Sequence, residues 1–115
     1  MITITNTSKD FSEVEQYLMT LDPGIESIKN LADGDIITVA GYIEFEDVKE
    51  TTGEVVKVMS IITPENKCYA CQSQTFKRSV KDIATIMHGK EFSIEKISGK
   101  TKAGRDYINC KLHIA

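Results

Sequence analysis

One helical segment interrupts a chain whose other apolar patterns mostly have the period of a β-strand. In residues 75–87 the apolar side chains recur at i, i+4, i+7 and i+11, which places four of them on one helix face: Phe76, Val80, Ile83 and Met87. His88 and Gly89 follow and predict the end of this helix, while Thr75 and Ser79 are both candidates for its N-cap. A single helix between two groups of strands leaves few possible folds.

Three strands are predicted before that helix. Residues 36–46 and 54–63 are rich in β-branched and aromatic side chains, and residues 68–73 form a shorter third strand. Short polar turns separate the three, so we expect an antiparallel meander. Gly41 lies inside the first strand and predicts a bulge or a sharp bend at that point.

Two more strands are predicted after the helix, at residues 92–97 and 106–114. The second alternates strictly, with Ile108, Cys110, Leu112 and Ile114 on one side and Tyr107, Asn109, Lys111 and His113 on the other. The loop that enters it, residues 98–105, contains two glycines and three cations. This strand therefore has an apolar back, a polar front and a basic loop at its start.

Five short strands cannot cover both faces of an open sheet, whereas a sheet coiled into a small barrel buries one face and removes most edges. The sequence therefore predicts a mainly β protein with a five-stranded barrel of the oligonucleotide/oligosaccharide-binding (OB) type, whose helix lies between strands three and four. We expect a single domain over residues 1–115, with an N-terminal extension at 1–33 and the barrel at 34–115.

The N-terminal extension contains a second predicted helix. Ser12 and Glu15 have the spacing of a capping box, and one apolar face follows from Phe11, Val14, Leu18 and Leu21. Residues 1–10 fit either an edge strand or a loose end, and residues 25–31 are ambiguous. The helix and the edge strands are also the candidate surfaces for a homodimer.

Charge is divided unevenly along the chain, although the net charge is only −3. Residues 1–54 have a net charge of −9 and residues 55–115 a net charge of +6. The negative total charge argues against a polyanion ligand, but this asymmetry favours a polyanion contact in the second half of the chain. No apolar run has the length of a membrane span and the N-terminus lacks a signal-peptide pattern, so we expect a cytoplasmic protein. Three cysteines fit reduced thiols.

Binding of a single nucleic-acid strand requires cations along a groove and exposed aromatic faces for the bases. The candidate phosphate contacts are Lys57, Lys100, Lys102, Arg105 and Lys111, with Lys77 and Arg78 as weaker candidates. The candidate stacking residues are Tyr107, Tyr42 and Tyr69, and Asn109 shares the strand face of Tyr107. Each tyrosine could instead be a core or rim residue, and each lysine an ordinary surface residue.

Other chemistries fit less well. Gly99-Lys100-Thr101 lacks the preceding glycine and the following helix of a P-loop. Cys68-x-x-Cys71 and Cys110-x-x-His113 have zinc-like spacing, but an offset of three on a strand sends the two side chains to opposite faces. No nucleophile, base or paired-carboxylate arrangement indicates an enzyme. We therefore expect no catalysis, no cofactor and no metal site.

Four stretches resemble the small single-stranded DNA-binding proteins of phages that infect Gram-positive bacteria: VEQYLMT at 14–20, GDIITVAGYIEFED at 34–47, SQTFKRS at 73–79 and SGKTKAGRDYINCKL at 98–112. The resemblance implies an OB-fold protein that coats unwound DNA during phage replication and recombination in the host cytoplasm. Bacterial relatives carry an acidic tail that recruits partners. Here a strand reaches almost to Ala115, so we expect replication or recombination partners to contact the folded surface.

One alternative remains open. An OB-type module could regulate a replication or host enzyme through its acidic half without binding DNA. The two hypotheses differ in salt dependence, because only phosphate contacts release counterions on binding.

Overall fold

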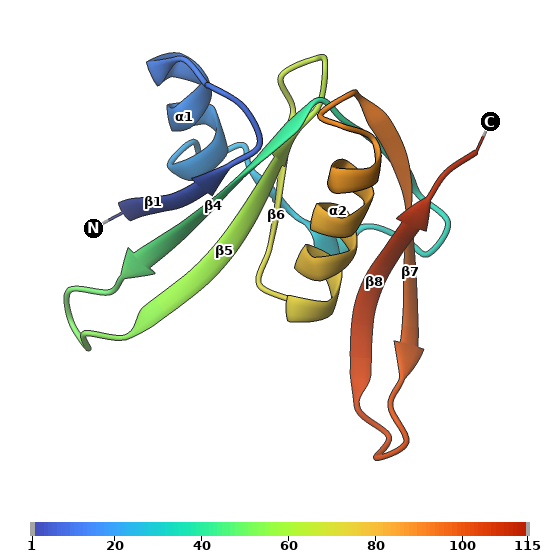
Figure 1. Ribbon diagram of the computed structural model, residues 1–115. Coiled ribbons are helices and arrows are strands. Elements are labelled where there is room, and N and C mark those ends of the chain that lie inside the picture. The colour runs from blue at the N-terminus through green and yellow to red at the C-terminus, as the bar shows by residue number, and fades with distance from the viewer. Residues whose placement is uncertain (1, 115) are drawn as a thin grey trace.

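The structure is a computed structural model that describes residues 2–114. It contains two β-sheets, two α-helices and one 3₁₀ turn (Figure 1). The strands are β1 (Ile2–Thr7), β2 (Glu26–Ser27), β3 (Ile36–Val39), β4 (Gly41–Val48), β5 (Val55–Ile62), β6 (Cys68–Cys71), β7 (Phe92–Lys100) and β8 (Asp106–Leu112). The helices are α1 (Glu13–Thr20), the 3₁₀ turn η1 (Ile28–Asn30) and α2 (Gln74–Ile86). The larger sheet has the order β1-β4-β5-β6-β2, and the smaller has the order β3-β7-β8.

The chain passes from the smaller to the larger sheet at Ala40 and Gly41, between β3 and β4. The single strand expected at residues 36–46 is therefore divided into β3 and β4. The change of direction between them lies where Gly41 predicts a bend. A Cβ atom on Gly41 would lie 2.7 Å from the Phe11 ring and 3.1 Å from Ser8 Oγ. Glycine is needed at this position because the N-terminal extension packs directly against the backbone.

Two hydrophobic cores lie on opposite faces of the larger sheet. The first lies between the two sheets and α2 and includes Ile37, Met59, Ile61, Phe76 and Ile94. The second lies under α1 and includes Phe11, Met19, Ile43, Phe45 and Ile62. Because the central strands β4 and β5 contribute to both cores, apolar residues follow one another directly where both faces are buried, as at Tyr42 and Ile43 in β4 and at Ile61 and Ile62 in β5.

The expected closed barrel does not form. Within residues 2–114 no hydrogen-bond ladder joins β6 to β8, and the strands form two sheets instead of one coiled sheet. Helix α2 lies between β6 and β8 in Figure 1 and contacts β8 along its edge. Ser73, the N-cap of α2, donates from Oγ to the Ile108 carbonyl at 3.2 Å, and Ser79 Oγ donates to Asn109 Oδ1 at 2.6 Å. Through these two hydrogen bonds, α2 provides part of the contact that a neighbouring strand would have made with β8.

The N-terminal extension is built as a strand and a helix. β1 is the edge strand of the larger sheet and pairs with β4, and the predicted capping box at the start of α1 is confirmed. The predicted apolar face of α1 is wrong in part, because Met19 is fully buried while Val14 and Leu21 are 68% and 61% exposed. The ambiguous residues 25–31 form β2, which pairs in parallel with β6, and then η1.

Candidate nucleic-acid interface

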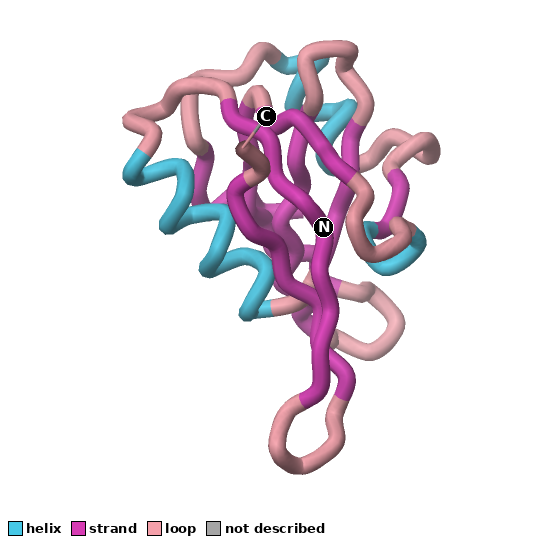
Figure 2. The backbone as a smooth tube through the Cα atoms, turned by 90° about the vertical axis from the view of Figure 1, so that its right-hand side faces the viewer, coloured by secondary structure: helices cyan, strands magenta, loops and turns pink. Residues whose placement is uncertain are grey.

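The β7–β8 hairpin projects beyond the rest of the molecule (Figure 2). Its loop closes with a hydrogen bond of 2.9 Å from the Thr101 N–H to the Arg105 carbonyl. Gly104 has a φ of +81°, a conformation that glycine adopts without strain. The loop chemistry that the sequence shows at residues 98–105 therefore produces a tight hairpin end.

The two faces of this hairpin carry different residues, because side chains alternate along paired strands. Lys96, Ser98 and Lys100 of β7 are paired with Cys110, Ile108 and Asp106 of β8, and we call this the inner face. Glu95, Ile97 and Gly99 are paired with Lys111, Asn109 and Tyr107, and we call this the outer face. Tyr107 and Lys100 therefore belong to opposite faces.

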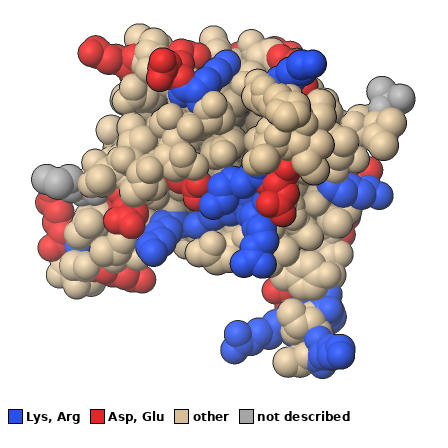
Figure 3. Space-filling model, viewed as in Figure 1, with Lys and Arg blue, Asp and Glu red and all other residues tan. Residues whose placement is uncertain are grey.

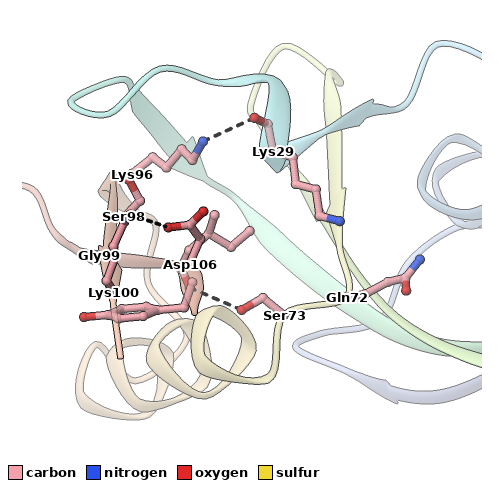
Figure 4. Close-up of a pocket in the computed structure, with 10 residues that line it drawn as sticks. Lys29, Gln72, Ser73, Lys96, Ser98, Gly99, Lys100 and Asp106 are labelled. Carbon is pink, nitrogen blue, oxygen red and sulfur yellow. Dashed lines mark hydrogen bonds and ion pairs between the residues drawn. The ribbon is translucent and has the colours of Figure 1, made fainter. Parts of the chain in front are cut away.

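A groove of about 830 Å³ runs along the inner face. Figure 4 shows Lys29 and Gln72 on one side of it and the hairpin residues on the other, with Ser73 hydrogen-bonded to β8. The groove is lined by Lys29, Gln72, Ser73, Lys96, Ser98, Gly99, Lys100, Asp106, Tyr107 and Ile108. Its walls thus come from η1, from the residues after β6, and from the hairpin.

A smaller hollow of about 240 Å³ continues this groove over the larger sheet. It shares Lys29 and Gln72 with the groove and adds Val58 of β5 and Ala70 of β6 to the lining. Lys29 therefore stands where the two spaces meet. Together they offer an extended surface with apolar patches between charged side chains, which suits a single nucleic-acid strand better than a compact ligand.

Lys96 is a buried residue that connects the two walls of the groove. It is only 6% exposed, and its Nζ donates to the backbone carbonyls of Leu31 and, at 3.4 Å, Lys29. The Lys96 N–H also donates to the Asp35 carbonyl at 2.9 Å, and the Lys96 carbonyl accepts from the Gly34 N–H at 2.8 Å. Lys96 therefore joins β7 to the opposite wall, and its ammonium is already bound within the protein.

Basic side chains gather at the end of the hairpin (Figure 3). Lys100, Lys102 and Arg105 are exposed, and Lys100 forms an exposed ion pair with Asp106 at 3.8 Å. In the part of the chain that the structure describes, Lys102 and Arg105 form no ion pair. We call residues 100–106 the hairpin tip, and its positive charge is available to an anion.

Comparison with known proteins identifies the family. A family model described as "Phage Single-stranded DNA-binding protein" matches residues 4–113. The chain belongs to this family.

Curated relatives include the single-stranded DNA-binding proteins of Bacillus phage PZA and Bacillus phage phi29. Each is 25% identical to this chain over 96 residues, which is 79% of this chain and 77% of the relative. No solved structure matches the chain. The predicted resemblance to phage single-stranded DNA-binding proteins is therefore confirmed at the level of the family.

The residues predicted for binding fall into separate places in this family member. The hairpin tip holds Lys100, Lys102 and Arg105, and the outer face holds Tyr107, Asn109 and Lys111. Asn109 Oδ1 accepts from Ser79 Oγ and from the Cys110 N–H at 2.8 Å, so it mainly attaches α2 to β8. Lys111 is exposed and ion-paired with Glu95 at 3.9 Å.

The other predicted residues lie away from the groove. Tyr42 does not fit the expectation of a stacking residue, because it is only 9% exposed and belongs to the core between the two sheets. Tyr69 is partly buried, and Lys67 Nζ lies 5.3 Å from its ring centroid. The contact with Tyr69 raises the pKa of Lys67, and the nearby Glu26 adds to this effect.

Lys57 lies in a different hollow, between β5 and the start of α2. Lys77 also lines this hollow but is buried, and its Nζ donates to the Lys57 carbonyl at 2.9 Å. Lys81 at the same junction is ion-paired with Glu44 at 3.4 Å. Figure 3 shows basic and acidic side chains side by side in the middle of this face. The Lys81–Glu44 ion pair balances part of the positive charge there.

Several groove residues were not predicted from the sequence, namely Lys29, Gln72, Ser73, Ser98 and Ile108. Lys29 lies in the segment whose structure the sequence left ambiguous, and it is far from the hairpin along the chain. No local pattern indicates that η1 packs against β7, so no local signal could have found Lys29.

The cysteines are structural in this fold. Cys68 lies in the core under α1 and Cys71 in the core between the sheets, which confirms that the offset of three places them on opposite faces of β6. Burial raises the pKa of both Cys71 and Cys110 to about 12, so these thiols stay protonated at neutral pH. Among residues 2–114, no group of three or more His, Cys, Asp and Glu side chains is placed to hold a metal ion. No helix in the same range has the length and hydrophobicity needed to cross a membrane.

Proposed function

We propose that this chain binds single-stranded DNA without sequence preference and coats it during phage DNA replication and recombination in the host cytoplasm, without catalysing a reaction. The observation that carries the proposal is the extended groove on the inner face of a hairpin whose tip is basic. Membership of the phage single-stranded DNA-binding protein family supports the same ligand.

In this proposal the single-stranded DNA lies along the groove and passes over the hairpin tip. Phosphates contact Lys29, Lys100, Lys102 and Arg105, since cations that follow the path of a backbone supply most of the sequence-independent affinity. Bases contact the apolar lining and the outer-face ring of Tyr107, because any base can stack on an aromatic face. Lys111 belongs to this outer face, and Lys57 forms at most an outlying contact.

The first experiment is fluorescence anisotropy of a labelled oligothymidylate about 30 nucleotides long, titrated with the protein at several salt concentrations. We expect tight binding that weakens as salt rises, with a log–log slope of about −0.7 for each phosphate contacted. A duplex of equal length serves as the control and should bind more weakly. Absence of binding to the single strand at low salt would refute the proposal.

One observation favours the alternative of a protein-interaction module. Val14, Tyr17 and Leu21 are exposed along one side of α1, which also carries Glu13 and Glu15 and no basic residue. A protein partner that contacts this acidic helix would bind without contacts to nucleic-acid phosphates. The anisotropy experiment separates the two functions, since an interaction module would leave the oligonucleotide unbound.

A further inference from the structure

Gly99 lies within β7, a place where glycine is usually unfavourable because it has no side chain to pack. Its φ lies outside the left-handed region, so the backbone conformation does not require glycine. A Cβ atom on Gly99 would lie 2.6 Å from Tyr107 Oη and 2.8 Å from Tyr107 Cζ. The feature that requires glycine here is therefore the aromatic ring.

Tyr107 is the cross-strand partner of Gly99, and its ring lies over the space that a side chain at position 99 would fill. The Tyr107 side chain is still 37% exposed. One side of the ring thus rests on the hairpin backbone and the rest remains open to solvent. A ring supported in this way has less freedom to lose when a base stacks on it, which favours binding.

Basic residues flank Tyr107 along the chain. Lys111 follows Tyr107 by two strand positions, and its ion pair with Glu95 is exposed on the Lys111 side. Arg105 precedes Tyr107 by two positions at the tip, and its backbone carbonyl accepts from the Thr101 N–H. A strand that leaves the groove over the tip would therefore find an aromatic face between two basic side chains.

We propose that Gly99 is a positioning residue that holds the Tyr107 ring as a stacking surface for one base of single-stranded DNA on the outer face of the hairpin. The proposal rests on the proposed function and deepens it, because it assigns one base to the ring of Tyr107, which also borders the groove, and names the residue that holds this ring in place. Gly99 itself contacts no DNA and acts through Tyr107.

Gly99→Ala tests this idea with little risk to the fold. The backbone conformation at this position accepts alanine, and the atoms in the way belong to the movable end of a partly exposed side chain. Alanine is at least as favourable as glycine inside a strand, so thermal stability should be unchanged or slightly higher. The ring, however, has to leave its place over β7.

We expect Gly99→Ala to weaken oligothymidylate binding by about 5- to 100-fold, close to the loss caused by Tyr107→Ala, since one base–aromatic stack is worth that much. The salt slope should stay near the wild-type value, because no phosphate contact is lost. Intrinsic tyrosine fluorescence should be quenched less on DNA binding than in the wild type.

The matched control is Gly99→Ala made in the Tyr107→Ala protein, where the added methyl group meets no ring. This double variant should bind as Tyr107→Ala does. Wild-type affinity in Gly99→Ala, or an equal further loss in the Tyr107→Ala background, would overturn the role of Gly99. Failure of the wild type to bind oligothymidylate would instead overturn the proposed function.

A measurement on the wild-type protein covers the case in which Gly99→Ala does not fold. The α-protons of a glycine under an aromatic ring experience an upfield ring-current shift in NMR spectra. We expect such a shift for Gly99, its loss in Tyr107→Leu and its retention in Tyr107→Phe, with oligothymidylate affinity following the same order. An unshifted Gly99 signal in the wild type would overturn the proposal.

Discussion

Two hairpins project toward the same side of the molecule but carry opposite charge (Figure 1). The tip of the β4–β5 hairpin, residues 47–54, has one lysine, Lys49, and three acids, Asp47, Glu50 and Glu54, and Lys49 is ion-paired with Glu54 at 3.9 Å. The tip of the β7–β8 hairpin has three cations, Lys100, Lys102 and Arg105, and one acid, Asp106. This difference in charge favours the β7–β8 hairpin as the one that a polyanion approaches.

The largest expected effect comes from giving the β7–β8 hairpin tip the negative charge of the β4–β5 hairpin tip. Replacing Lys100, Lys102 and Arg105 together by glutamate should reduce oligothymidylate affinity by at least about 100-fold, because attraction at three phosphates becomes repulsion. The salt slope should fall in magnitude by about 2. Anisotropy at several salt concentrations measures both quantities. Lys49→Glu in the first hairpin is the control and should change affinity less than about threefold.

A buried lysine at the base of each hairpin offers the next comparison. Lys77 donates to the Lys57 carbonyl of β5, whereas Lys96 joins β7 to the groove wall that carries Lys29. Lys77→Met and Lys96→Met should each lower the free energy of unfolding by roughly 1–3 kcal/mol, since buried carbonyls lose their donor. Only Lys96→Met should also weaken DNA binding, by about tenfold, because the groove wall that carries Lys29 is no longer held against β7.

Urea unfolding measures the stability of both variants, and anisotropy on the folded proteins measures their affinity. Equal affinities in Lys77→Met and Lys96→Met would show that Lys96 supports the fold without shaping the groove. A smaller salt slope in Lys96→Met than in Lys29→Ala would show a direct phosphate contact, which its bound ammonium argues against.

The contrast between the hairpins also shows what the sequence could predict. The β7–β8 hairpin, its basic loop and the helix before it follow from local periodicity, which fixes strands, alternation and turns over a few residues. The groove depends on Lys29 and Lys96, which are 67 residues apart. The predicted face of α1 missed Met19, and the predicted barrel stays open because α2 lies beside β8. These outcomes depend on packing between distant segments, which no local pattern encodes.

A third test concerns the core between the two sheets, where Cys71 of β6 and Cys110 of β8 are buried. Burial raises the pKa of each thiol from 9.0 to about 12, so the stability that each contributes is complete below pH 9 and is lost as the pH rises toward 12. At pH 10 the loss is on the order of 1 kcal/mol for each thiol. Urea unfolding of Cys71→Ala should therefore depend less on pH between 7 and 10 than that of the wild type, and identical dependence would contradict a buried neutral thiol.

The smallest expected effect tests whether the acidic half of the chain takes part in binding. Lys29 is exposed, lies in the half with net charge −9 and yet stands where the two hollows of the groove meet. Lys29→Ala should weaken oligothymidylate binding by about three- to fivefold and reduce the salt slope by about 0.7, the contribution of one phosphate. Lys9→Ala, an exposed lysine of the same half outside the groove, is the matched control. Equal affinities in the two variants would confine DNA binding to the β7–β8 hairpin, whereas the expected difference would show that the strand passes between the hairpin and η1.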